Sequence, residues 1–361
     1  MSDKPTLQSL RERIDALDEQ LQALLNERAQ CAQQVAHAKI AQGETGDFYR
    51  PEREAEILRR VRERNTGPLD DAEITRLFRE IMSACLALER PLAIGYLGPE
   101  GTFTQAAALK HFGHSVTTEA LPAIDVVFRA VEAGECNYGV VPIENSTEGV
   151  VNHTLDMFLR SPLNICGEVS LRIELHLLSR EADFGAVQKV YAHQQALAQS
   201  REWLDANLPR AERIAVSSNG EAARRVAQES GAAAIAGEAA AELYGLSRLA
   251  SRIEDEPGNT TRFLVIGKQA VGRSGQDKTS LLIAVKNQPG ALYRMLEPMA
   301  RHGLSMTRIE SRPSRRGIWD YVFFVDIEGH VEDEAVAAAL KELEQHASLF
   351  KVLGSYPRAV I

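Results

Sequence analysis

The N-terminal part of the chain repeats apolar positions at the period of an α-helix. Apolar side chains recur at alternating steps of four and three residues, at Leu10, Ile14, Leu17, Leu21 and Leu24. This spacing predicts an amphipathic helix from about residue 6 to Ala41, far longer than an average helix. Two shorter helices are expected after it, one starting at Pro51 and one capped by Asp70 or Asp71. Because three such helices cannot form a large core alone, we expect a dimer that shares the long helices.

The middle of the chain, from Leu92 to about Val271, alternates short apolar runs with alanine-rich helical stretches. This alternation is typical of βαβ units and predicts an α/β domain of two lobes with a cleft between them. The expected strands include Ala93–Leu97, Tyr138–Val141, Val190–His193 and Ala233–Ala236, and the expected helices include Ala123–Ala133, Leu197–Asn207 and Gly220–Ser230. The glycine-containing stretch Gly272–Gln276 indicates a linker.

The last part of the chain, from Thr279, has the order strand, helix, strand, strand, helix, strand. The expected strands are Leu281–Val285, Ser305–Ser311, Trp319–Ile327 and one near Phe350–Leu353, with amphipathic helices around Leu292–Met299 and Val336–Leu343. This order is that of a ferredoxin-like α+β fold. We therefore predict a multidomain chain with an all-α domain at 1–91, a two-lobed α/β domain at 92–271 and an α+β domain at 278–361.

Composition and charge narrow the possible partners. A chain of 361 residues with 44% hydrophobic residues fits two to three globular domains. The net charge of −9 disfavours nucleic acid and anionic membrane surfaces as partners. The four cysteines are far apart and form no CxxC pair, so neither a disulfide framework nor a metal site is expected. The N-terminus has no apolar signal core and no apolar run reaches 18 residues, which indicates a cytoplasmic protein.

Two polar runs, Pro142–Gly149 and Asn259–Phe263, place small hydroxyl and amide side chains where apolar strands meet loops. Ligands bind at such strand ends in α/β sheets, because several loops converge there on a rigid frame. Neither a metal-ligand cluster nor a nucleophile–base pair accompanies these runs. They therefore predict a site that holds a small polar acid by hydrogen bonds and does its chemistry with a hydroxyl group.

These two runs resemble the signatures of the prephenate dehydratase family, and so do Gly95–Thr104 and Asp255–Pro257. The resemblance implies a periplasmic-binding-protein-like fold that removes carbon dioxide and the ring hydroxyl from prephenate to give phenylpyruvate, with Thr261 as the catalytic general acid. The prephenate-binding residues that it implies are Glu144, Asn145, Ser146, Thr147, Gln195, Gln199, Thr261 and Arg262. Arg262 could equally form a structural ion pair.

The stretch Ala192–Ser200 resembles a third motif of that family, Ser-His-Pro-Gln-Ala-Leu-x-Gln-Cys, and departs from it at Ala192, Gln194 and Ser200. Only Gln195 and Gln199 are carried over from it. The neighbouring His193 is more often a packing residue in such a position than a catalyst. The glycines of Gly95–Gly101 follow a GxxGxxG spacing with Pro99 in the turn, so a dinucleotide site is not favoured and no cofactor is expected.

The predicted helical domain carries cations suited to a dianion. Arg28 and Lys39 are eleven residues apart, which places them within about 20° on one helix face and roughly 16 Å apart along it. Arg11 is rotated by about 100° from Arg28, so in a dimer it would serve the partner's site. Cys85 and Glu89 share a face of the third helix at spacing i, i+4.

These positions resemble the all-helical chorismate mutases. The resemblance places Arg11, Arg28 and Lys39 on the family's substrate-binding cations, Arg53 and Glu54 on its Arg-Glu pair, and Glu89 on the position that bonds the ether oxygen. Cys85 is counted among the chorismate-binding residues. Arg50 and Glu52 compete for the roles of Arg53 and Glu54. Chorismate rearranges internally to prephenate, so positioning by arginines and stabilisation of the ether oxygen by Lys39 and a protonated Glu89 suffice. Such a role requires a raised pKa of Glu89.

Two C-terminal motifs, Asn287–Leu292 and Glu310–Pro313, resemble the phenylalanine-binding motifs of an ACT regulatory domain. The resemblance implies that L-phenylalanine binds between paired domains and inhibits by population shift. The residues it implies are Gly290, Ala291, Leu292, Glu310, Ser311, Arg312 and Pro313. An ion pair at the surface is the alternative for Glu310 and Arg312.

Taken together, nearly the whole chain resembles the bifunctional chorismate mutase–prephenate dehydratase family of phenylalanine biosynthesis. The expected substrates are chorismate and prephenate, the expected effector is L-phenylalanine, and the expected assembly is a homodimer, with a tetramer left open. Two alternatives remain: a monofunctional dehydratase with a degenerate helical domain, and a non-catalytic amino-acid sensor or solute-binding protein. Thr261 and the helical cations disfavour the sensor, which needs neither.

Overall fold

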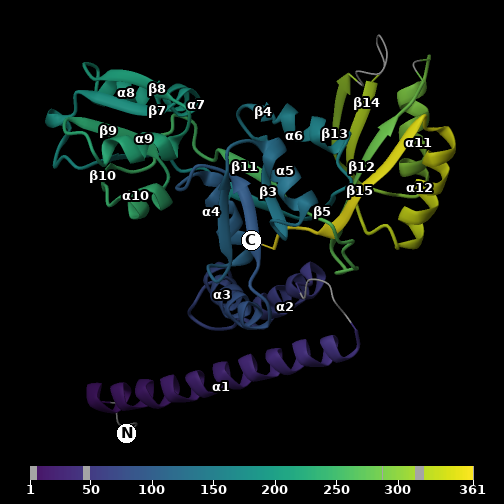
Figure 1. The fold of residues 1–361 in the computed structure, drawn as a ribbon, viewed down its shortest axis with the longest axis horizontal. Coiled ribbons are helices and arrows are strands. Elements are labelled where there is room, and N and C mark those ends of the chain that lie inside the picture. Colours follow the sequence, from purple (N-terminus) through teal and green to yellow (C-terminus); the bar gives the residue numbers. More distant parts are fainter. Residues whose placement is uncertain (1–5, 44–48, 287, 314–320, 361) are drawn as a thin grey trace, which may run out of the picture.

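The computed structural model describes residues 6–43, 49–286, 288–313 and 321–360. A helical domain, a two-lobed α/β domain and a small α+β domain follow one another along the chain (Figure 1). Asn287 of the first expected effector motif and Trp319 of an expected strand lie outside the described residues. Among the helices that the structure describes, none combines the length and the apolar content needed to cross a lipid bilayer.

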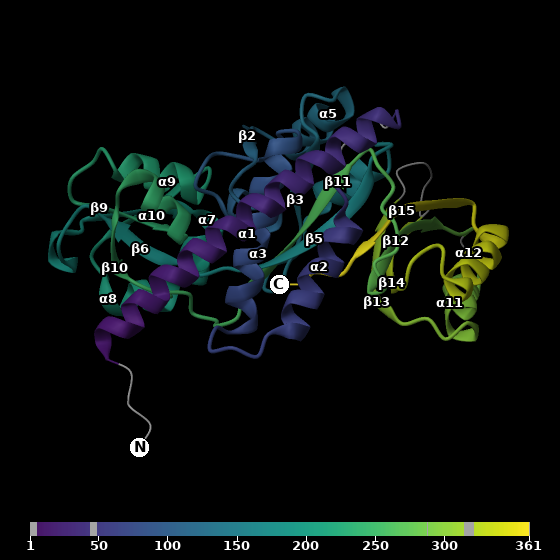
Figure 2. The ribbon, with the colours of Figure 1, turned by 90° about the horizontal axis from the view of Figure 1, so that it is seen from below.

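The helical domain consists of α1 (Leu7–Ala41), α2 (Pro51–Arg64) and α3 (Asp71–Glu89), which agree with the three helices predicted from periodicity. The Thr6 side chain caps α1 and the Asp70 side chain caps α3, each by accepting a backbone N–H three residues ahead. Helix α1 lies as a long rod below α2 and α3 and reaches well past them (Figures 1 and 2). Its apolar stripe therefore remains exposed to solvent within one chain.

The first lobe of the α/β domain is a mixed sheet with the strand order β2-β1-β3-β11-β5, and β4 pairs with β3. Its strands are β1 (Ala93–Leu97), β2 (Thr117–Leu121), β3 (Tyr138–Asn145), β4 (Gly149–Val150), β5 (Asn164–Arg172) and β11 (Thr260–Gly267). Its helices are α4 (Phe103–Phe112), α5 (Ile124–Ala133) and α6 (Asn152–Phe158). Strand β11 returns from the second lobe and inserts antiparallel between β3 and β5, which ties the lobes together.

The second lobe is a sheet with the strand order β10-β6-β9-β7-β8. Its strands are β6 (His176–Ser179), β7 (Lys189–His193), β8 (Glu212–Val216), β9 (Ala232–Ala236) and β10 (Ser247–Ala250). Its helices are η1 (Phe184–Ala186), α7 (Gln194–Gln199), α8 (Arg201–Asn207), α9 (Asn219–Val226) and α10 (Glu238–Tyr244). The prediction of one helix over Leu197–Asn207 is wrong, because Ser200 leaves helical geometry (φ −119°, ψ 20°) and separates α7 from α8.

The C-terminal domain has the predicted ferredoxin-like order, with the sheet β13-β14-β12-β15. Its elements are β12 (Asp277–Ala284), α11 (Ala291–Arg301), β13 (Met306–Pro313), β14 (Tyr321–Glu328), α12 (Glu334–His346) and β15 (Leu349–Pro357). The helices α11 and α12 cover the outer face of the sheet (Figure 1).

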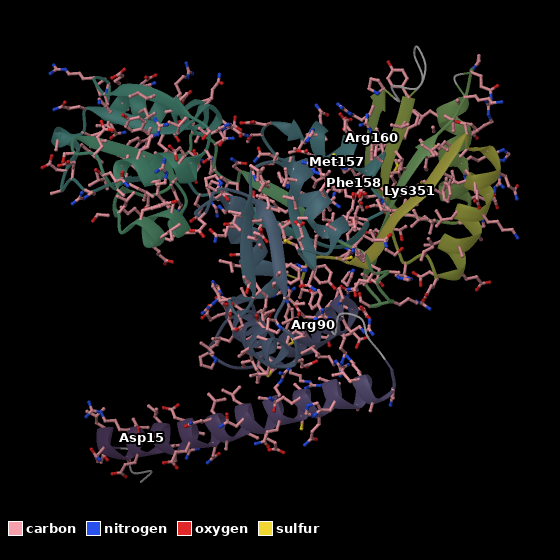
Figure 3. The ribbon with its side chains drawn as sticks, viewed as in Figure 1. Asp15, Arg90, Met157, Phe158, Arg160 and Lys351 are labelled. Atoms are coloured by element: carbon pink, nitrogen blue, oxygen red, sulfur yellow. The ribbon has the colours of Figure 1, made fainter. Side chains whose placement is uncertain are left out.

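The inner face of that sheet shares one hydrophobic core with the first lobe. Leu282, Phe324 and Leu353 from the sheet are buried in the same cluster as Phe158 and Leu264 from the lobe. At the edge of this contact the Lys351 ammonium donates to the carbonyl oxygens of Phe158 and Ser161 (Figure 3). The C-terminal domain is thus packed directly on the lobe that carries β3 and β11.

Candidate functional sites

A cleft of about 740 Å³ separates the two lobes. The first lobe contributes Asn145 from the end of β3 and Thr261 from the start of β11, and these two residues are paired in the antiparallel register. The second lobe contributes Gln195 and Gln199 from α7. The structure therefore brings these four predicted residues to one cavity, as expected of residues at converging strand ends.

The hydroxyl group of Thr261 is held as a hydrogen-bond acceptor. Asn145 Nδ2 lies 2.8 Å from Thr261 Oγ1. The amide orientation of Asn145 is fixed, because its Oδ1 accepts the backbone N–H groups of Thr147 (3.0 Å) and Glu148 (3.2 Å). Since Thr261 Oγ1 accepts from Asn145, the hydrogen of Thr261 itself is free to be donated into the cleft. This is the arrangement that a general acid requires.

The polar side chains that line the cleft are mainly hydroxyl and amide groups, set among apolar side chains. Among the described residues that line it, none is a lysine or an arginine, and the ionisable ones are His193 and Glu221. Glu221 is paired with two arginines on its own helix, which lower its pKa to about 2. Thr102 and Ser218, the N-caps of α4 and α9, line the cleft from opposite lobes, where helix N-termini favour anions.

Two predicted residues, Glu144 and Arg262, point away from the cleft. Each is next in sequence to a cleft residue, and side chains alternate between the faces of a strand. Glu144 pairs with Arg308 of β13 at 3.2 Å, and Arg262 pairs with Asp326 of β14 at 2.8 Å. Arg262 therefore forms the structural ion pair that was its alternative role.

Arg262 belongs to a buried group of charges between the lobe and the C-terminal sheet. It also pairs with Glu168 at 2.8 Å, and Glu168 in turn pairs with Lys278 at 2.7 Å. Burial alone would lower the pKa of Arg262, but Tyr356, Asp326 and Glu168 raise it above its ordinary value. The guanidinium thus stays charged at this contact.

The remaining residues of the first predicted run support the cleft. Ser146 Oγ accepts the backbone N–H of Thr260 at 3.0 Å, which joins the loop after β3 to the start of β11. Thr147 Oγ1 donates to Asn145 Oδ1 at 2.7 Å and accepts from Gln199 Nε2 at 3.0 Å. Neither Ser146 nor Thr147 lines the cavity itself.

In the helical domain the structure brings Arg28, Lys39 and Glu89 together. Burial raises the pKa of the Glu89 carboxyl above its ordinary value, although the positive charges of Lys39 and Arg28 act in the opposite direction. Cys85 is buried one helical turn before Glu89. Arg11 lies near the other end of α1, which at 1.5 Å per residue is about 42 Å from Lys39.

Arg53 and Glu54 are not brought to this group. Arg53 is exposed and pairs with Glu56 at 3.1 Å. Glu54 faces the α/β domain instead and pairs with Arg79 of α3 at 3.2 Å, ten residues before Glu89. Burial raises the pKa of Glu54 against the opposing effect of Arg79.

The surroundings of Arg79 join the helical domain to the first lobe. Arg79 also donates to the backbone oxygen of His111 at the end of α4. Burial, with a further contribution from Arg79, lowers the pKa of His111 to about 3, so its ring is neutral. The Tyr49 hydroxyl lies 3.1 Å from His111 Nε2 and completes this contact.

The two motifs expected to bind an effector lie at the same end of the C-terminal sheet. Gly290 caps α11 with φ +78°, a left-handed conformation that favours glycine, and Ala291 and Leu292 begin the helix. Glu310, Ser311, Arg312 and Pro313 lie on the edge strand β13. Strand β14 lies between β12 and β13, and the pocket that Gln288 and Ala291 line includes none of the residues Glu310–Pro313. Arg312 pairs with Asp156 of α6 at 2.9 Å.

Asn259 is a cleft residue that the sequence-based assignment missed. It is buried, lines the cavity and accepts a hydrogen bond of 2.8 Å from Asn145. Asn259 and Thr261 are spaced i, i+2 at the start of a strand, which places their side chains on one face. This spacing in the sequence indicates that Asn259 faces the cleft together with Thr261. Within the described chain, no group of three His, Cys, Asp or Glu side chains is arranged to hold a metal ion.

Comparisons with known proteins match all three domains. Residues 10–90 match the model of chorismate mutase type II, residues 94–271 that of prephenate dehydratase, and residues 279–345 that of the ACT domain. Bifunctional chorismate mutase/prephenate dehydratases from Stutzerimonas stutzeri and Pseudomonas aeruginosa are 57% and 56% identical to this chain over 365 residues, covering 100% of each chain.

A solved structure agrees with these matches over the last two domains. The prephenate dehydratase from Arthrobacter aurescens, in complex with L-Phe, is 34% identical with a TM-score of 0.69, over 74% of this chain and 90% of that chain. With full-length relatives above 50% identity, the chain belongs to the family of bifunctional chorismate mutase/prephenate dehydratases.

Proposed function

We propose that this chain rearranges chorismate to prephenate at Arg28, Lys39 and Glu89, and converts prephenate to phenylpyruvate in the interlobe cleft. The observation that carries the proposal is the Thr261 hydroxyl, which accepts from Asn145 and so presents its own hydrogen to the cleft. The grouping of Glu89 with two cations in a separate domain supports the first step. The full-length identity to bifunctional enzymes supports the pairing of the two steps.

In the dehydratase step the driving force is aromatisation of the ring. The bond to the ring carboxylate breaks and its electron pair enters the ring, while the ring hydroxyl departs with the electron pair of its own bond. Negative charge therefore builds on the departing oxygen, where the Thr261 O–H donates and helps it leave as water. The side-chain amide of Gln195 lines the same cleft and is placed to hold a carboxylate or keto group of the substrate. Both hydrogens of the Asn145 amide and both of the Gln199 amide are donated to protein groups, so these two residues shape the cleft.

In the mutase step no proton is transferred, so positioning and charge stabilisation are sufficient. Arg28 and Lys39 attract the two carboxylates of chorismate, and Lys39 stabilises the ether oxygen as its bond to carbon lengthens. Glu89 donates to the same oxygen when it is protonated, which the raised pKa favours.

The direct test supplies the purified chain with chorismate alone. We expect chorismate to disappear and phenylpyruvate to form, and L-phenylalanine to suppress phenylpyruvate formation. Accumulation of prephenate without phenylpyruvate would contradict the dehydratase assignment. If chorismate remained intact while added prephenate reacted, the mutase assignment would be wrong and the helical domain would be degenerate.

The pH dependence of the mutase step tests the role of Glu89. The folded-state pKa of Glu89 is raised, so the donating, protonated form is present below that pKa and is lost as the pH rises through it. We expect chorismate consumption at low substrate concentration to fall with rising pH, and Glu89→Gln to remove this fall because its amide donates at every pH. Dehydratase activity of the same variant on added prephenate is the control. A wild-type mutase rate that does not change with pH would contradict this role.

The exposed stripe on α1 supports a dimer that shares the long helices. Leu10, Ile14, Leu17, Leu21 and Leu24 each expose between 43% and 61% of their surface within one chain. A contiguous apolar stripe of this kind indicates a protein contact. If α1 crosses α1 of a second copy, Arg11 of one chain reaches the Arg28, Lys39 and Glu89 group of the other, and each site is complete.

Subunit mixing tests this arrangement. Arg11→Ala and Lys39→Ala should each lower mutase activity, while a heterodimer of the two holds one intact site. Since half of the dimers in an equal, co-expressed mixture are heterodimers, we expect recovery to about a quarter of wild-type activity. A mixture of Lys39→Ala with Glu89→Ala is the matched control, because both residues lie in one chain's site and no intact site forms. Absence of recovery in the first mixture would show that the two chains do not share a site.

The effector site is proposed to form between two C-terminal domains, because the two motifs share a sheet end but are separated by β14 within one chain. The Glu310 carboxylate would bind the ammonium group of L-phenylalanine. We expect Glu310→Ala to raise the half-inhibitory concentration of L-phenylalanine by about tenfold or more, as the loss of one charged hydrogen bond does. Glu344→Ala, an exposed carboxylate on α12, should leave inhibition unchanged. Unchanged inhibition in Glu310→Ala would refute the assignment.

A further inference from the structure

Four side chains around the cleft form a closed ring of hydrogen bonds. Asn145 Nδ2 donates to Asn259 Oδ1 (2.8 Å), and Asn259 Nδ2 donates to Gln199 Oε1 (3.2 Å). Gln199 Nε2 donates to Thr147 Oγ1 (3.0 Å), and Thr147 Oγ1 donates to Asn145 Oδ1 (2.7 Å). The ring therefore returns to the amide that also donates to Thr261.

The direction of these hydrogen bonds is determined by groups outside the ring. Backbone N–H groups of Thr147 and Glu148 require an acceptor, which sets Asn145 Oδ1 toward them. The Glu148 carboxylate, 3.2 Å from Gln199 Nε2, requires a donor and sets the amide of Gln199. Every member consequently donates to the next in the same sense, an arrangement in which hydrogen bonds strengthen one another.

Asn259 joins the two lobes within this ring. Asn259 is 3% exposed and is the last residue of the segment that connects β10 in the second lobe to β11 in the first lobe. Its backbone oxygen accepts the N–H of Ile173 (2.8 Å), which lies in the segment that connects β5 to β6 between the same two lobes. Gln199, to which its side chain donates, is the last residue of α7 in the second lobe. Asn145, Thr147 and Thr261 all belong to the first lobe.

We propose that Asn259 is a positioning residue for the dehydratase step, acting on the Thr261 hydroxyl through the amide of Asn145. Its Oδ1 takes one hydrogen of that amide, so the other hydrogen stays directed at Thr261 Oγ1 and the Thr261 O–H stays directed at the substrate. Its Nδ2 donates to Gln199 Oε1 and so links the Asn145 amide to the second lobe. The orientation of the acid therefore depends on the closed arrangement of the lobes, and parting of the lobes opens the ring. This inference rests on the proposed role of Thr261.

The test measures prephenate turnover in Asn259→Ala. We expect kcat to fall about 10- to 100-fold, the effect of one lost buried hydrogen bond at the acid, while KM changes by no more than about twofold. In a Thr261→Val background, the further change Asn259→Ala should cost nothing, because the group through which Asn259 acts is already missing. Gln199→Ala, which removes only the link to the second lobe, should lower kcat by a smaller factor.

A circular dichroism spectrum and a thermal unfolding curve that match those of the wild-type chain confirm that each variant has folded, and Asn207→Ala, an exposed amide in the second lobe, is the matched control. A rise of KM at unchanged kcat would mean that Asn259 only binds substrate, and would overturn the inference. So would an equal loss in the wild-type and Thr261→Val backgrounds, which is the result expected of a packing role. These outcomes differ from failure of the proposed dehydratase function itself, because in that case the wild-type chain would leave prephenate unconverted.

Discussion

The antiparallel pairing of β3 with β11 is the constraint on which both the cleft and its contact with the C-terminal domain depend. The register places Asn145 opposite Thr261 and Glu144 opposite Arg262. Because side chains alternate along a strand, the first pair faces the cleft and the second pair faces the C-terminal sheet. A shift of this register by one residue would exchange the two faces, taking Thr261 out of the cleft and Arg262 away from the C-terminal sheet. The residues that line the cleft and those that contact the C-terminal domain are thus consecutive on the same two strands.

The charges on the outer face make this contact specific. Arg262, Glu168, Lys278 and Asp326 are two cations and two anions held together by ion pairs of 2.7–2.8 Å. Removal of one member of such a buried group leaves an uncompensated charge, which typically costs about 3–5 kcal/mol. The apolar core shared by the lobe and the sheet supplies the bulk of the contact. The charges then fix its orientation, and one of them, Arg262, is next in sequence to Thr261.

Local patterns in the sequence predicted much of this molecule. Helical periodicity gave the three N-terminal helices, and the order of strands and helices gave the C-terminal fold. Motif resemblance placed Asn145, Gln199 and Thr261 in one cleft, although Asn145 and Thr261 are far apart in sequence. Because side chains alternate along a strand, placing Thr261 in the cleft also predicts that Arg262 and Glu144 face away from it, contrary to their assignment as prephenate-binding residues. The pairing of Glu54 with Arg79 depends on how two helices of one domain pack, and the contact of Arg79 with His111 depends on how two domains pack. No local pattern in the sequence contains either kind of contact.

The two reactions are assigned to two separate sites of one chain. The most direct measurement compares chorismate loss and phenylpyruvate formation in Thr261→Val and in Lys39→Ala. We expect Thr261→Val to consume chorismate and accumulate prephenate. We expect Lys39→Ala to leave chorismate intact and still convert added prephenate to phenylpyruvate. If either substitution abolished both reactions in a folded chain, the two sites would not be separate.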